Sequence, residues 1–121
     1  MKIDDFFAAI QTIDPNASRY QAIGQPGDEY TVFSDYRTEY LYADDIPCEK
    51  LVFVQIDLFT RFEKSRIFDK LHALLFASDT DISCAPVTTD FETDSRYIHH
   101  IFDVQVHCDL DTAEVKTNGD I

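Results

Sequence analysis

The sequence predicts an α+β fold in which a single, mostly antiparallel sheet is covered by two α-helices. Three observations indicate this class: helical periodicity near the N-terminus, a second helical stripe in mid-chain, and β-rich segments on either side of that stripe. The chain of 121 residues suits one domain, and no linker divides it. We therefore expect a single domain over residues 1–111 and a flexible acidic tail over residues 112–121, which lack an apolar pattern.

The first third of the chain predicts a helix followed by β structure. Apolar side chains recur at helical spacing over residues 3–13, and Pro15 closes that segment. Residues 24–28 (Gly-Gln-Pro-Gly-Asp) form the clearest turn cluster. Residues 30–43 are dense in Tyr, Phe, Val and Thr, which predicts either one strand or a hairpin bent near Ser34–Thr38.

The middle of the chain predicts a strand and then a helix. Pro47 is expected to end the preceding strand, because proline cannot donate to a ladder. Residues 51–60 alternate strictly, and the side chains assigned to the core face are Val52, Val54, Ile56 and Leu58. Thr60 and Glu63 have the spacing of a capping box, which predicts a helix over 62–77. Its apolar stripe consists of Ile67, Phe68, Leu71, Leu74 and Leu75.

Two further strands complete the expected sheet. The acidic stretch from Asp79 to Asp94 is predicted to hold a short strand near 87–91. A long strand is predicted over 96–110, with apolar residues from Ile98 to Leu110 on one face. The histidines His99 and His107 fall on its other face.

The charge balance limits the classes of partner. Ten Lys and Arg against 23 Asp and Glu give a net charge of −13. Such a field repels phosphates at long range, which argues against tight binding to nucleic acid. An apolar fraction of 45% also excludes an intrinsically disordered chain.

No residue pattern indicates catalysis, a cofactor or a metal. The three cysteines are far apart, and none forms a CxxC pair. Phosphate-binding, nucleophile-elbow and HExxH motifs are absent from the sequence. Asp79-x-Asp81-x-Ser83 imitates the start of a calcium loop, but Cys84 replaces the expected glycine and Asp90 the expected bidentate Glu. We therefore predict a non-enzymatic protein with no cofactor and no metal ligand.

The charges are unevenly distributed along the chain. Four bases fall within residues 61–70, whereas the stretch 79–94 holds five acids and no base. The bases serve either to solvate an exposed helix face or to meet the acids of a neighbouring copy. In the second case Phe53 and Phe59 form the apolar centre of the contact. The complete predicted interface set is Phe53, Phe59, Arg61, Arg66, Lys70, Asp79, Asp81, Asp90 and Glu92.

The order of segments from about Tyr30 to Leu110 resembles the small tail-terminator, or tail-completion, proteins of long-tailed bacteriophages and prophages. The resemblance begins with the extended aromatic entry 30–33, the string 42–45 (Tyr-Ala-Asp-Asp) and a strand ending at 56–60 (Ile-Asp-Leu-Phe-Thr). A helix and the aromatic, histidine-bearing strand 97–104 follow.

The resemblance implies a structural protein that forms a ring, typically of six subunits, on the end of the tail tube. Its partners would be other copies of itself, the tail tube protein and a head-completion protein, with DNA passing through without tight binding and no membrane involved. The expected location is the virion tail, after assembly in the bacterial cytoplasm. Three alternatives stay open: another head–tail connector component, an acidic inhibitor that mimics DNA, and a small-molecule-binding module or enzyme.

Overall fold

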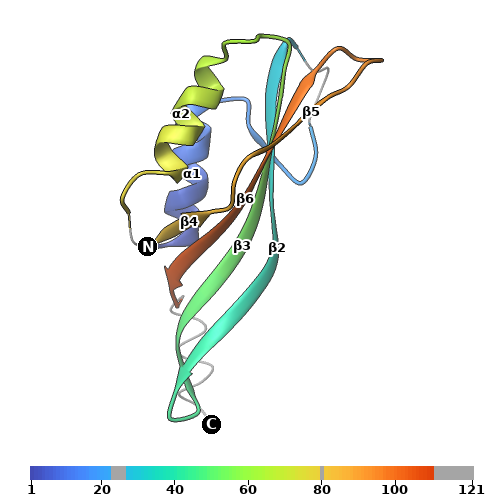
Figure 1. Ribbon diagram of the computed structural model, residues 1–121. Coiled ribbons are helices and arrows are strands. Elements are labelled where there is room, and N and C mark those ends of the chain that lie inside the picture. The colour runs from blue at the N-terminus through green and yellow to red at the C-terminus, as the bar shows by residue number, and fades with distance from the viewer. Residues whose placement is uncertain (23–26, 80, 111–121) are drawn as a thin grey trace.

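The computed structural model describes residues 1–22, 27–79 and 81–110, which form two helices and six strands packed as in Figure 1. The elements are α1 (Ile3–Ile13), β1 (Ser18–Arg19), β2 (Glu29–Ala43), β3 (Ile46–Thr60), α2 (Arg66–Leu75), β4 (Ile82–Cys84), β5 (Thr88–Phe91) and β6 (Ile98–Asp109). The strand order is β1-β2-β3-β6-β4, and β5 also pairs with β6. All neighbours are antiparallel except β1 and β2, which are parallel.

The core lies between the two helices and one face of the sheet. The face of β3 predicted to be buried is buried, and Phe102, Val104 and Val106 of β6 lie beside it. The helices contribute Leu71 and Leu75 from α2, together with Phe6, Phe7 and Ile10 from α1. All these side chains belong to one hydrophobic cluster, so helix and sheet share a single core.

Strands β2 and β3 form a long hairpin that extends beyond the helices (Figure 1). Its turn consists of Asp44 and Asp45, whose φ angles of 52° and 67° are those of a two-residue hairpin turn with both central residues left-handed. A register shift between Asp35 and Arg37 marks a β-bulge in β2. Residues 30–43 therefore belong to one strand, and the alternative hairpin bent near Ser34–Thr38 is wrong.

The expected fold class, one mostly antiparallel sheet covered by two helices, is wrong. Strands hold 49% of the described residues, the six-stranded sheet is mixed, and both helices are short. Part of the reason is that neither described helix lies against the distal half of the β2–β3 hairpin (Figure 1). The molecule is therefore mainly a twisted sheet with helices on part of one face.

The second helix is shorter than expected because a different residue caps it. Ser65 is the N-cap, and its hydroxyl accepts a hydrogen bond from the Phe68 amide at 3.1 Å. Thr60 instead ends β3; its hydroxyl donates to Glu29 and accepts from the Phe62 amide. The capping box of Thr60 and Glu63 does not form, and the predicted helix start at 62 moves to Arg66.

Several other boundaries also differ from the expectation. Pro47 lies inside β3 opposite Tyr42, next to a register shift, where its missing amide is tolerated. The short strands β1 and β4 were not foreseen, since two or three residues carry no periodicity. Residues 24–26 of the predicted turn and the predicted tail 112–121 lie outside the described residues.

Candidate interaction surface

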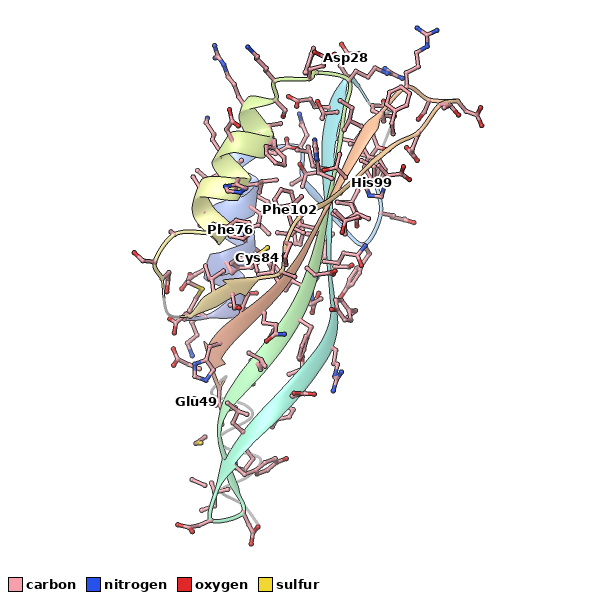
Figure 2. The ribbon with its side chains drawn as sticks, in the orientation of Figure 1. Asp28, Glu49, Phe76, Cys84, His99 and Phe102 are labelled. Atoms are coloured by element: carbon pink, nitrogen blue, oxygen red, sulfur yellow. The ribbon has the colours of Figure 1, made fainter. Side chains whose placement is uncertain are left out.

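The face of the sheet turned away from the helices carries the most unusual mixture of side chains. In Figure 2 Phe102 points toward the helices and His99 points to the opposite side of β6. Strand alternation places the other residues of this face by register. We call this surface the open face; its members on the three long strands include Tyr30, Val32, Ser34, Arg37, Glu39, Leu51, Phe53, Gln55, Asp57, Phe59, His99, Ile101, Asp103, Gln105 and His107.

Four rings pack together at one end of the open face. Phe59 stacks on Tyr30, with centroids 4.7 Å apart, and on His99, with centroids 4.1 Å apart. Tyr97 meets Tyr30 and Phe59 edge-on, and the Arg61 guanidinium lies 4.2 Å from the Tyr97 ring centroid. Burial raises the pKa of Tyr30 above its usual range, so its hydroxyl stays neutral near pH 7. This aromatic cluster gives the open face a rigid, amphipathic end.

A polar group adjoins the aromatic cluster. His99 Nε2 lies 2.8 Å from Asp57 Oδ1, and Gln55 Nε2 donates to both Asp57 oxygens at 3.1 Å. Because an ionised carboxylate only accepts, the imidazole donates its Nε2 proton to Asp57. The His99 and Asp57 side chains are 21% and 16% exposed, so the pair is partly shielded from solvent. The arrangement fixes the imidazole ring against Phe59.

Phe53 occupies the middle of the open face. Its ring lies 6.2 Å from the ring of Tyr36, and the Arg37 guanidinium is 5.0 Å from its centroid. Beside it is a hollow of about 190 Å³, lined also by Cys84, Asp103 and Gln105. A hollow of this volume is smaller than the roughly 300–1,000 Å³ of typical ligand pockets, which favours contact with a protein surface over capture of a small molecule.

The distal part of the β2–β3 hairpin exposes large side chains in both strands. We call residues 36–50 the arm. Its exposed large residues are Tyr36 (57%), Tyr40 (41%), Leu41 (39%), Tyr42 (63%) and Ile46 (63%). The sequence shows the aromatic density of β2 but not its exposure, because alternation alone does not reveal where the helices end. A two-stranded ribbon with this much exposed apolar surface is typical of an assembly contact.

The predicted basic residues do not lie on the open face as a group. Arg61 follows β3 and contacts Asp28 at 3.2 Å and the Ser95 carbonyl oxygen. Arg66 and Lys70 are exposed on α2, which packs on the other side of the sheet. Phe53 and Phe59 do share the open face.

The predicted acidic residues fall into two separate groups. Asp79 accepts from the Asp81 amide beside β4, and Asp81 lies 3.5 Å from the amino group of Met1. Asp90 is opposite His99 in the β5–β6 pair, and Glu92 accepts from the Ser95 hydroxyl next to the aromatic cluster. The structure thus brings Arg61, Glu92 and Phe59 to one end, away from Asp79 and Lys70.

The described part of the chain has no cluster of three or more His, Cys, Asp or Glu side chains placed to hold a metal ion. Burial raises the pKa of the Cys84 thiol to about 11, which makes it a poor nucleophile near pH 7. Among the described residues, no helix has the length and apolar character needed to cross a bilayer.

No protein-family model matches the chain, and the search of curated proteins returns no match.

Proposed function

We propose that this protein is a structural component of a phage tail, which caps the tail tube as a ring and joins the tail to the head. The class comes from the sequence resemblance over residues 30–110. The observation that supports it best is the open face together with the arm, two surfaces suited to protein contacts.

The open face has the composition of a subunit interface. Its aromatic residues supply apolar area, while Asp57, His99 and Gln55 are already paired within the chain. An interface made of such groups leaves few polar atoms unsatisfied when water is excluded. In the proposed ring, Phe53 lies near the centre of the contact between neighbouring copies.

The charge of −13 per chain fits a tube that conducts DNA. Acidic walls repel phosphates, so a genome passes without sticking, whereas basic walls would retain it. The same charge makes free subunits repel one another, and ring closure is expected at high concentration or on the tube end.

The test compares two variants in assembly. Phe53→Asp places a charge in the proposed contact, whereas Lys70→Glu changes a charge on the exposed face of α2 and is the matched control. The protein is mixed with tubes of the tail tube protein encoded in the same gene cluster and examined by sedimentation and negative-stain microscopy. Wild type and Lys70→Glu should cap the tubes, and folded Phe53→Asp should not.

Any of three results would overturn the proposal. One is normal capping by folded Phe53→Asp, which would show that the open face is not the contact between subunits. The others are a gene cluster without tail genes, and wild-type protein that neither forms rings nor binds tubes. Binding to a head-side connector protein instead of tubes would favour the connector alternative.

A further inference from the structure

The outer edge of β2 is the longest unpaired strand edge in the described part of the chain. On its inner side β2 pairs with β3 along nearly its whole length. On its outer side β1 covers only Val32 and Phe33. From Ser34 to Ala43, the described residues provide no second neighbour for β2. Such an edge presents unsatisfied backbone amides and carbonyls to another strand.

The sequence along this edge is self-complementary. Residues 36–40 read Tyr-Arg-Thr-Glu-Tyr, which is symmetrical about Thr38 except that Arg37 and Glu39 carry opposite charges. When two copies lie antiparallel with a two-fold axis at Thr38, each Arg37 faces Glu39 of the other copy. Side chains directly opposite in an antiparallel pair are close enough to interact.

We infer that two copies of this chain pair through the outer edges of β2, antiparallel and centred on Thr38, to join their sheets into one. The occupant of the edge is a second copy because the edge complements its own charges. An isologous contact of this kind needs one self-complementary patch.

The charges also fix the register. Moving the axis by one residue places either Arg37 against Arg37 or Glu39 against Glu39, and like charges directly opposite are unfavourable. Only the axis at Thr38 gives two opposite-charge pairs. Within each chain the Arg37 guanidinium already pairs with the Glu39 carboxylate, and the two side chains are 60% and 41% exposed on the open face. Pairing of two copies therefore exchanges these ionic partners across the two-fold axis and does not supply either side chain with its first partner.

The bulge at Tyr36 limits the contact. Bulges twist an edge strand and end regular pairing, so the paired segment is short. With −13 charges on each copy, the pair is expected to be weak and to tighten as salt screens the overall repulsion. This two-fold contact differs from the head-to-tail contact of the proposed ring and does not depend on it.

The test exploits the charge symmetry. Arg37→Glu and Glu39→Arg are purified separately, and dimerisation is measured by analytical ultracentrifugation and native mass spectrometry. Each single variant places like charges opposite one another in both pairs, and we expect its dissociation constant to rise at least tenfold. A mixture of the two restores both pairs and should form a heterodimer with wild-type affinity. The double variant carrying both changes should also dimerise as wild type.

A cross-link gives an independent readout. Directly opposite residues in an antiparallel ladder have Cα atoms about 4.5–5.5 Å apart, within the range of a disulfide. In a Cys48→Ser background, Thr38→Cys should form a covalent dimer under mild oxidation. Ala43→Cys, exposed on the same strand but away from the axis, is the control and should stay monomeric.

Three results would overturn the inference. If the wild-type protein is monomeric at millimolar concentration in moderate salt, the proposed dimer does not exist. If the single variants dimerise as wild type does, or if their mixture yields no heterodimer, the proposed pairing of Arg37 with Glu39 is wrong. If Thr38→Cys and Ala43→Cys cross-link equally, the two-fold axis does not lie at Thr38. Circular dichroism confirms that each variant is folded.

Discussion

Replacing Leu71 with alanine tests the central packing relation of the fold. Leu71 lies on α2 with no exposed surface and belongs to the same cluster as Val54 and Phe102 of the sheet. The change removes three carbon atoms, which at about 0.8 kcal/mol per buried methylene accounts for roughly 2.4 kcal/mol. The cavity left behind adds to this, giving an expected loss of about 2–5 kcal/mol. Helix propensity does not contribute, because alanine is at least as good a helix former as leucine.

The assay is urea unfolding followed by circular dichroism at 25 °C. Lys70→Ala, at the adjacent exposed position of α2, is the matched control and should change the free energy of unfolding by less than about 0.5 kcal/mol. Leu74→Ala, at a half-buried position, should fall between the two. A loss below about 0.5 kcal/mol for Leu71→Ala would refute the conclusion that α2 covers this sheet.

Three further predictions follow from individual side chains. Ser65→Ala should lower the free energy of unfolding in urea by about 0.5–2 kcal/mol because the N-cap hydrogen bond is lost. Glu63→Ala should lower it by less than about 0.5 kcal/mol. Equal losses for the two variants would support the capping box of Thr60 and Glu63 and contradict Ser65 as the N-cap. Burial lowers the pKa of His100, so below about pH 6.5 the unfolded chain binds a proton that the folded chain does not. The free energy of unfolding should therefore decrease as the pH is lowered. His100→Gln should flatten this pH dependence, and an unchanged pH profile would contradict the prediction. At pH 8 the exposed Cys48 should react with a thiol reagent well before Cys84, whose pKa of about 11 keeps it protonated; a fast phase that survives Cys48→Ser would contradict this order.

The predictable parts of the fold are those where one periodic pattern faces one environment. Helix α1 was predicted with its observed bounds, because its Phe pair and isoleucines follow one stripe. The alternation of β3 from Leu51 onward gave its buried face correctly, since helices cover that face there. Farther out neither of the two described helices covers the same strand, and its burial pattern disappears.

The errors came from local signals that tertiary contacts override. Thr60 and Glu63 match a capping box, but the Thr60 hydroxyl bonds Glu29 across the β2–β3 pair instead. The bases on α2 and Phe53 both belong to the predicted interface set, and the structure places them on opposite sides of the sheet. Which face a residue reaches depends on strand register, and the sequence alone does not specify the partner strand.

The order of strands in the sheet has a consequence for how the chain folds. Strands β2 and β3 are joined by a two-residue turn and can zip together early, since hairpins form within microseconds. The other side of β3 pairs with β6, so that Glu49 meets Asp109 and a long loop must close first. During synthesis, one edge of β3 therefore stays unpaired until β6 emerges from the ribosome. That interval, in which a central strand has one open edge, is when the nascent chain is most prone to aggregate.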